Sequence, residues 1–382
     1  MRPFVVIDLP KLNELSSISA SRFGAFKECL LRESCSAGRY QPLLPVAPKS
    51  VLGTVAHKVL ELAAHGHFSL NRRSADDLWD DFLQEKEAKL LVDPVHEHLV
   101  PLKKSCTEYF LVKARTTQTA TRLAHDGPSG SSAESAPRSI GPEIRVQSRD
   151  GSVKGSIDAV VYNDGELTFI DYKTGEIYCE DGGVLVVKPE YAIQLKLYAV
   201  LYNETFAKWP ARLFLIGMHG QKAEIGFEKA ECLSLLESVK SALAEANERI
   251  RSAIAARNAD SLANPCPSAC KFCRLRPACT AYCRARYDSA DSEWPSDIWG
   301  KIESLNTSST GFVAVRLTDT TTEGGTAVVR RLSKKRFVFF EQVQSGWRLA
   351  AYSLRKESSS HTYCETPMSG IFATSGELAD GG

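Results

Sequence analysis

The sequence of 382 residues predicts an α/β protein with a small C-terminal β-barrel, and three observations support this fold class. Two apolar runs that read as strands, 152–162 and 166–174, lie between segments with helical periodicity. Five cysteines fall between 266 and 283. Further along, five short strand-like segments follow one another without a helix. We therefore expect four segments: a large domain at 1–286, a linker at 287–296, a barrel at 297–357 and a flexible tail at 358–382.

The composition is that of a globular protein. Hydrophobic residues make up 43% of the chain and charged residues 24%. No stretch reaches the roughly 20 apolar residues of a membrane helix, and the apolar run at 4–9 contains Asp8, which argues against a signal peptide. We therefore expect a cytoplasmic protein without a membrane partner. In that reducing compartment, eleven cysteines indicate metal binding rather than disulfides.

The spacing of apolar residues predicts four helices before the strands. They span 16–31, the residues from Ser50 onward, 76–91 and 99–123. In the last of these helices, Cys106, Phe110 and Leu111 are expected to face inward. A loop rich in Gly, Ser and Pro is expected at 125–142.

The helix from Ser50 carries an unusual polar stripe. Gly53, His57 and Glu61 are spaced by four residues and therefore share one face of a mostly apolar helix. A lone histidine in such a helix is commonly a satisfied core residue. Here the glycine clears space one turn earlier, so His57 is a candidate for contact with a metal or a phosphate.

Two carboxylates and a lysine are expected to meet at the end of the two central strands. Asp171 and Lys173 are two residues apart, so strand alternation points both to one face. A tight turn at 163–165 brings Asp158 alongside them. Because carboxylates bind Mg²⁺ or Mn²⁺ and a lysine can orient the attacking water, this set predicts a metal-dependent phosphodiesterase. Glu143, which opens another strand, either completes the acidic cluster or is a surface acid.

Two more helices and a strand are expected after the central strands. The helix at 188–202 carries Gln194 and Tyr198 on one stripe, where they either face the site or belong to an aromatic core. The strand at 211–217 and the long helix at 229–257 are read as parts of the core.

The cysteine cluster predicts a metal centre. Cys270, Cys273 and Cys279 have the spacing Cys-x2-Cys-x5-Cys, with Cys266 and Cys283 on either side as further candidates. Four thiolates bind either zinc or an iron–sulfur cluster. A local zinc site has enough ligands among these five cysteines.

The C-terminal part is basic. Residues 298–356 carry ten Lys and Arg against four acidic residues, whereas the whole chain has a net charge of +1. The five expected strands are 298–305, 311–317, 326–332, 336–344 and 347–355. Basic residues and aromatics there suit a surface for single-stranded nucleic acid, in a barrel of the oligonucleotide-binding type. The alternative is that most of the aromatics form the barrel core: Phe312, Phe337, Phe339, Trp347 and Tyr352.

In their order and spacing, these motifs resemble the RecB-like branch of the PD-(D/E)XK nuclease superfamily over residues 16–283. The most similar group is its iron–sulfur members, such as the CRISPR-associated exonucleases and the AddB-type recombination nucleases. The resemblance implies a restriction-endonuclease-like core with helical additions. Four family motifs match: Gly53/His57/Glu61, Gly155 with Asp158, Asp171-Tyr172-Lys173, and Gln194 with Tyr198.

The resemblance also implies roles for these residues. Asp158, Asp171 and His57 would hold Mg²⁺ or Mn²⁺, and Lys173 would orient the water. Gln194 and Tyr198 would position DNA, and Glu61 and Glu143 are secondary candidates. A [4Fe–4S] cluster would have four ligands: Cys29, Cys270, Cys273 and Cys279. The chain departs from the family at Leu30, where proline is usual, and Cys35, Cys266 and Cys283 are extra candidates for the ligand positions.

We expect a DNA exonuclease that acts on single-stranded ends in repair, recombination or anti-phage defence, with a helicase or another subunit as a partner. No Gly-x4-Gly-Lys-[Ser/Thr] motif occurs, so a motor would have to come from elsewhere. One alternative is a non-catalytic DNA-binding subunit that uses the nuclease fold and the metal cluster for architecture. Another is a zinc-ribbon nucleic-acid-binding protein, for which Cys29 would be dispensable.

Overall fold

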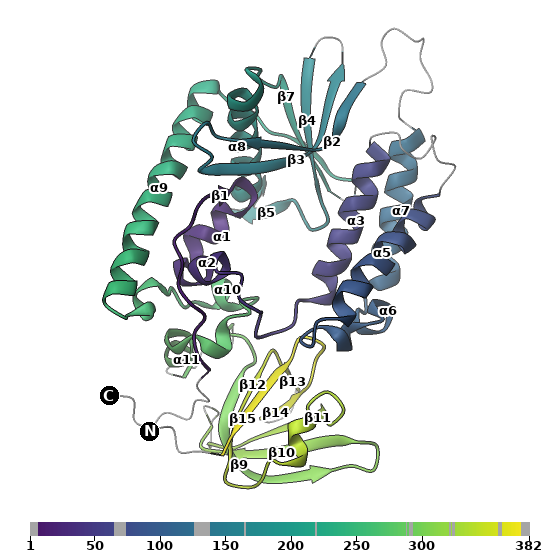
Figure 1. Cartoon of the computed structure of the whole chain (residues 1–382). Coiled ribbons are helices and arrows are strands. Elements are labelled where there is room, and N and C mark those ends of the chain that lie inside the picture. Colours follow the sequence, from purple (N-terminus) through teal and green to yellow (C-terminus); the bar gives the residue numbers. More distant parts are fainter. Residues whose placement is uncertain are drawn as a thin grey trace.

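The computed structural model of the chain has a three-layer α/β/α body above a C-terminal β-sheet (Figure 1). It describes residues 7–375 except 65–73, 126–137, 164–165, 218–219, 288, 290–292, 321, 323–324 and 358–360. None of the helices in these residues is long and apolar enough to cross a membrane. Of the predicted turn at 163–165, Asn163 ends a strand and 164–165 lie outside the described residues. Most of the predicted loop at 125–142 also lies outside them, but 138–142 already belong to a strand.

The N-terminal helix expected at 16–31 is instead several short elements. Strand β1 (Ile18–Ser19) and a 3₁₀ turn, η1 (Ala20–Arg22), precede α1 (Phe23–Glu28) and α2 (Leu30–Ala37). The chain is extended at Cys29, with φ −155° and ψ 105°, which separates the two helices. The prediction of one continuous helix was therefore wrong. The apolar spacing continues from α1 into α2, so the sequence pattern gives no sign of the break.

One helical layer covers one face of the main sheet. It consists of α3 (Pro48–Ala64), α5 (Ala75–Leu91), η2 (Glu97–Leu99), α6 (Leu102–Ser105) and α7 (Tyr109–His125). The prediction of a single helix at 99–123 was therefore wrong. Phe110 and Leu111 are 73% and 48% exposed, against expectation, whereas Cys106 is buried. Tyr109 is the aromatic that packs inward, with its ring edge-on to Trp79.

The main sheet has the order β1-β3-β4-β7-β8, with β2 paired to β3. Its remaining strands are β2 (Arg138–Gln147), β3 (Val153–Asn163), β4 (Glu166–Lys173), β7 (Arg212–Gly217) and β8 (Lys222–Glu224). Strands β3 and β4 are antiparallel, while β4 and β7 are parallel. The residues of β4 alternate between two cores: Phe169 packs toward α8 and α9, and Tyr172 packs among the residues of α3, α5 and α7.

The second helical layer consists of α8 (Pro189–Phe206) and α9 (Lys229–Ala255). Between β4 and α8 lies a separate hairpin of β5 (Tyr178–Asp181) and β6 (Val184–Val187). Its turn residues Gly182 and Gly183 both have positive φ, 57° and 82°, as a two-residue hairpin turn requires. The chain therefore passes from β4, which carries Asp171 and Lys173, through this hairpin into α8.

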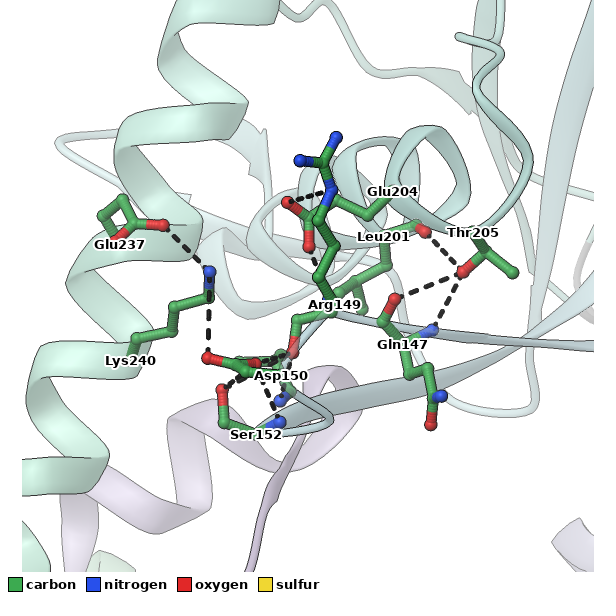
Figure 2. Close-up of polar contacts among 11 residues, drawn as sticks. Gln147, Arg149, Asp150, Ser152, Leu201, Glu204, Thr205, Glu237 and Lys240 are labelled. Atoms are coloured by element: carbon green, nitrogen blue, oxygen red, sulfur yellow. Dashed lines mark hydrogen bonds and ion pairs between the residues drawn. The ribbon is translucent and has the colours of Figure 1, made fainter.

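The turn that leads into β3 is fixed against both helices of this layer (Figure 2). The backbone N–H of Arg149 donates to Oε2 of Glu204 on α8 at 2.8 Å, and Ser152 Oγ donates to Asp150 Oδ1 at 2.7 Å. Nζ of Lys240 on α9 lies 4.0 Å from Asp150 Oδ2. The strand that carries Asp158 is therefore anchored at its start to two helices.

The C-terminal part forms a seven-stranded sheet of order β13-β14-β11-β10-β9-β12-β15. Its strands are β9 (Ile298–Thr307), β10 (Phe312–Thr318), β11 (Ala327–Ser333), β12 (Arg348–Tyr352), β13 (Arg355–Lys356), β14 (Thr362–Cys364) and β15 (Gly370–Thr374). In the described residues this order has two ends, so the barrel expectation is replaced by an open sheet. The expected strand at 336–344 contains instead a 3₁₀ turn, η6 (Val338–Glu341). Strands β14 and β15 lie in the segment expected to be a flexible tail.

The C-terminal sheet packs against the main body rather than standing apart from it. Trp299 and Tyr352 belong to the same buried cluster as the main-body residue Tyr282. The rings of Tyr282 and Trp299 lie 6.2 Å apart. The other face of the sheet has its own core, which includes Val315 and Leu349. The part of the main body next to the sheet contains α10 (Pro267–Cys270), η4 (Arg276–Ala278) and α11 (Thr280–Tyr287), and Figure 1 labels α10 and α11 there.

Candidate active site

Two buried aspartates from neighbouring strands form the centre of the site. The antiparallel register of β3 and β4 places Asp158 next to Asp171, with exposed fractions of 7% and 1%. Oδ2 of Asp158 accepts a hydrogen bond from the backbone N–H of Tyr172 at 2.8 Å. The same oxygen lies 2.8 Å from Nε2 of His57 on α3. The structure thus brings together three of the predicted metal ligands.

Lys173 and Gln194 complete a connected polar set around Asp171. Nζ of Lys173 lies 2.8 Å from Oδ2 of Asp171 and donates to Oε1 of Gln194 at 2.8 Å. Nε2 of Gln194 donates to Oδ1 of Asp171 and to the hydroxyl of Tyr198, both at 2.8 Å. Gln194 and Tyr198 therefore face the site through one turn of α8, although both are also buried.

The electrostatics of the site favour a cation between the two carboxylates. Burial, together with the charge of Asp158, raises the pKa of Asp171 to about 6, even though Lys173 and His57 act in the opposite direction. Burial alone would lower the pKa of His57, but its hydrogen bond to Asp158 and the nearby carboxylates raise it above its ordinary value. The ammonium of Lys173, 2.8 Å from Oδ2 of Asp171, places positive charge beside the two carboxylates.

These residues line a pocket of about 740 Å³. Within the described part of the chain, no three His, Cys, Asp or Glu side chains are already grouped around one position that would hold a metal. The donor chemistry still fits Mg²⁺ or Mn²⁺, because Asp158 and Asp171 present carboxylate oxygens to one pocket. Within the described residues, Oδ2 of Asp171 is buried without a hydrogen bond, and its ion-pair partner is the ammonium of Lys173, at 2.8 Å.

The two secondary carboxylates differ in their placement. Glu143 lines the pocket and is exposed, with φ 46°. Glu61 is fully buried one turn beyond His57 and is not among the pocket residues. Its Oε2 accepts a hydrogen bond from Nζ of Lys58 at 3.0 Å, while Oε1 has no hydrogen-bond partner among the residues that the structure describes. Burial raises the pKa of Glu61, although Lys58 opposes the shift.

Two basic residues that line the pocket, Arg145 and Lys154, were not predicted as site residues from the sequence. They lie on the paired strands β2 and β3, and neither makes an ion pair with any described residue. Arg145 is two residues beyond Glu143, so strand alternation places both side chains on one face, and this signal was available. Lys154 directly precedes the Gly155 of the family motif.

The glycines of the two matched motifs permit close packing around the site. A Cβ on Gly155 would lie 2.5 Å from Cε1 of Tyr198, which no side chain tolerates without a shift. A Cβ on Gly53 would lie 3.2 Å from Oγ1 of Thr174, so α3 approaches the end of β4 closely there. Both glycines therefore have a steric reason for their place beside the pocket.

Four cysteines that are far apart in the sequence line one small cavity of about 20 Å³: Cys29, Cys270, Cys273 and Cys279. Side-chain contacts bring the two segments together. Nη1 of Arg32 donates to the carbonyl of Ala269 at 3.3 Å, and Nδ2 of Asn264 donates to the carbonyl of Glu28 at 2.9 Å. Burial raises the pKa of the thiols of Cys270, to about 12, and of Cys273 and Cys279. Thiols are the donors that a soft metal centre would bind as thiolates, although no three of these side chains are already grouped as a metal site in the described residues.

The three extra cysteines do not line this cavity. Cys35 is fully buried, and its thiol donates to the carbonyl of Pro10 at 3.7 Å. Cys266 is half-buried, with its Sγ 3.5 Å from Oγ of Ser268. Cys283 is buried in the main core beneath Tyr352.

The C-terminal sheet offers less free surface for nucleic acid than its composition indicates. Tyr352 and Phe337 are buried, and Phe312 is exposed among the five aromatics named above. Arg336 is paired with Glu365 at 2.7 Å, and Arg330 with Glu357. The reading in which most of the aromatics form a core therefore fits the structure better.

Comparisons with known proteins place the chain in a family. A sequence profile of the PD-(D/E)XK nuclease superfamily matches residues 17–280. The Gene 69 protein of Mycobacterium phage D29 is 32% identical over 133 residues, which cover 34% of this chain and only 43% of that protein. A solved structure, "Crystal structure of SSO0001", is 14% identical and covers 61% of this chain and 96% of that one, with a TM-score of 0.26. This score is too low to define a shared fold. The chain belongs to the PD-(D/E)XK nuclease superfamily, whose members are generally metal-dependent phosphodiesterases.

The raised pKa of Asp171 predicts a pH dependence of the stability of the metal-free protein. A folded pKa of about 6 lies above the ordinary value of 3.8, so this group favours the folded state below about pH 4. That contribution is lost as the pH rises through about 6, at a cost of up to about 3 kcal/mol. Asp171→Asn should therefore stabilise the metal-free protein at pH 8 more than at pH 4. Thermal unfolding with EDTA measures this, with the exposed Asp181→Asn as control; equal differences at both pH values would refute the shift.

Proposed function

We propose that the protein is a metal-dependent deoxyribonuclease that degrades DNA from single-stranded ends. The observation that carries the proposal is the hydrogen-bonded set of Lys173, Asp171 and Gln194, with Asp158 beside it, in one pocket. A decayed nuclease fold retained only for binding has no need to keep two carboxylates, a lysine and an amide in one buried, connected set.

Each side chain has a distinct task in this proposal. Asp158 and Asp171 would hold Mg²⁺ or Mn²⁺, with His57 as a further ligand, and the cation would stabilise negative charge at the scissile phosphate. Lys173 orients the attacking water from its position between Asp171 and Gln194. Gln194 fixes the lysine and the carboxylate relative to each other, and Tyr198 fixes Gln194.

The depth of the carboxylates favours a single strand as the substrate. Asp171 is 1% exposed and Asp158 7%, so a phosphodiester must enter the pocket to reach a cation held there. A single strand bends into such a pocket, whereas a duplex resists bending on that scale. Mode, polarity and substrate can be tested with end-labelled linear, circular single-stranded and duplex DNA in Mg²⁺, Mn²⁺ and EDTA. Cleavage of circles as fast as of linear strands would contradict an exonuclease, and no cleavage in either cation would favour a non-catalytic subunit.

We further propose that the protein belongs to the RecB-like, iron–sulfur branch of the superfamily. The convergence of Cys29 with the three clustered cysteines on one cavity supports this assignment, because a local zinc site would not involve Cys29. Absorption spectra with iron, sulfide and zinc analysis on protein purified without oxygen test it. About four irons per chain supports the cluster, and one zinc in a colourless protein refutes it.

Arg145 and Lys154 are expected to bind the DNA backbone beside the reacting phosphate. Both are cations without an ion pair among the described residues, in a pocket whose centre is acidic, so they offer the contacts to phosphate that the carboxylates do not. Replacing either with alanine should lower the salt dependence of single-strand binding by about one unit of slope in a log–log plot. Fluorescence anisotropy in Ca²⁺ measures this slope. The exposed Lys103→Ala serves as control, and an unchanged slope in both pocket variants would remove these residues from the DNA path.

Gly155→Ala is expected to reduce cleavage by roughly 10- to 100-fold, because its Cβ forces the ring of Tyr198 away and shifts Gln194 with it. Gly175→Ala is the matched control, since a Cβ there meets nothing within 4 Å. Single-turnover cleavage at saturating DNA gives the comparison. Full activity in Gly155→Ala would mean that Tyr198 does not position Gln194.

A further inference from the structure

One arginine of the cysteine segment, Arg276, is almost fully buried and uses its donors on two parts of the fold. Its Nη1 donates to the carbonyl oxygens of Cys270, Lys271 and Cys273, at 2.7, 2.9 and 3.2 Å. These carbonyls belong to the turn that presents two of the cavity thiols. The two hydrogens of Nη1 are thus shared among three carbonyls, which fixes the shape of that turn.

The other donors of Arg276 reach the C-terminal sheet. Nε donates to Oδ2 of Asp297 at 2.9 Å, and Nη2 donates to Oγ of Ser353 at 2.7 Å. Asp297 is itself fully buried and directly precedes β9. It also accepts from the hydroxyl of Tyr282 at 2.6 Å and from the backbone N–H of Ser353 at 2.7 Å.

Arg276 and Asp297 are isolated from water, so their relative position is tightly constrained. Arg276 is 2% exposed and Asp297 0%, so neither charge can be compensated by solvent if the other moves. The planar guanidinium offers its donors in a fixed fork, so the carbonyls of the cysteine turn and the carboxylate of Asp297 must stay in register. A displacement of the sheet therefore displaces the cysteine turn.

We infer that Arg276 is a positioning residue for the metal cluster and that Asp297 and Ser353 make the C-terminal sheet part of the cluster's scaffold. The inference rests on the proposed iron–sulfur centre. It assigns to the sheet a role beyond nucleic-acid contact. Binding of the cluster would stabilise the docked sheet, and the docked sheet would stabilise the bound cluster. Outer partners that orient metal ligands commonly change metal retention by 10- to 100-fold when they are replaced.

Iron release from the full chain tests this inference. Asp297→Asn keeps the shape of the side chain and removes its charge, and Arg276→Lys keeps the charge and removes the fork. Both should release iron to a chelator roughly 10- to 100-fold faster than the wild type under anaerobic conditions. Glu303→Gln is the control, because it removes the carboxylate that pairs with Arg316 at 3.6 Å between β9 and β10 on the exposed surface of the same sheet. It should release iron at the wild-type rate.

The reciprocal measurement is hydrogen exchange of β9 and β12 with the cluster present and after its removal. Faster exchange in these strands than in β10 after iron removal supports the inference. If Asp297→Asn and Arg276→Lys do not fold, Ser353→Ala removes one hydrogen bond and should still accelerate iron release. Wild-type release rates in all three variants would overturn the inference while leaving an iron-loaded nuclease intact. A wild-type protein without iron would overturn the proposed cluster as well.

Discussion

Lys173→Ala is expected to abolish DNA cleavage, lowering the single-turnover rate by at least about 10²- to 10³-fold while leaving DNA affinity nearly unchanged. Nζ of Lys173 is the cation that contacts both Asp171 and Gln194, so its loss removes the group that orients the water and neutralises a buried carboxylate. The phosphate contacts of the pocket rim, including Arg145 and Lys154, remain. Asp171→Asn should give the same loss through the cation site.

The control for this experiment is Lys196→Ala. Lys196 lies on α8 two residues after Gln194 but pairs with Glu231 outside the pocket. Cleavage is followed under single-turnover conditions in Mg²⁺ and Mn²⁺, and affinity is measured in Ca²⁺. Activity in Lys173→Ala at the level of the control would contradict its role. Loss of binding together with cleavage would show that Lys173 holds the DNA rather than the water.

The centre of the site was predictable because its signals are local. Alternation along one strand places Asp171 and Lys173 on one face, and a helical spacing of four places Gln194 and Tyr198 on one stripe. The pairing of two consecutive strands then brings Asp158 to Asp171. Only short-range geometry is needed at each of these steps.

The errors concern features that local spacing cannot distinguish. A run of apolar residues at helical spacing is equally compatible with one helix or with several short ones, so the break at Cys29 and the division of 99–123 were missed. Phe110 was expected inside, but its neighbour Tyr109 is the aromatic that packs on Trp79. In the C-terminal part, apolar residues in a 3₁₀ turn at Val338–Glu341 resembled a strand.

Long-range pairs were beyond the reach of the sequence. Arg276 and Asp297 are both common surface residue types, and only the docking of the C-terminal sheet buries them together. Ser353 joins them from a third segment. Arg145 and Lys154 likewise become candidates for DNA contact only through the pocket, which forms where β3 pairs with β1, β2 and β4.

Cys29→Ser is expected to lose the metal centre and to lower the thermal unfolding midpoint by on the order of 10 °C. Cys29 and Cys270 are about 240 residues apart in the sequence but line one cavity, so a cluster that binds both closes a very long loop. Closing such a loop restricts the unfolded chain, and the native state gains stability accordingly. The visible absorbance and the iron content should fall together with the midpoint.

Two further cysteine variants distinguish a loss of metal ligands from a general loss of a buried thiol. Cys35→Ser changes another N-terminal cysteine that is fully buried but outside the cavity, so it should keep its iron. Cys266→Ser separates the two metal hypotheses: it should keep iron if Cys29 is the fourth ligand, and it should lose zinc if the site is local to the cysteine cluster. Metal retained in Cys29→Ser but lost in Cys266→Ser would exclude the iron–sulfur assignment. In that case no shared metal joins the N-terminal and C-terminal ends of the nuclease domain. Direct contacts then hold them together, such as the hydrogen bond from Arg32 to the carbonyl of Ala269.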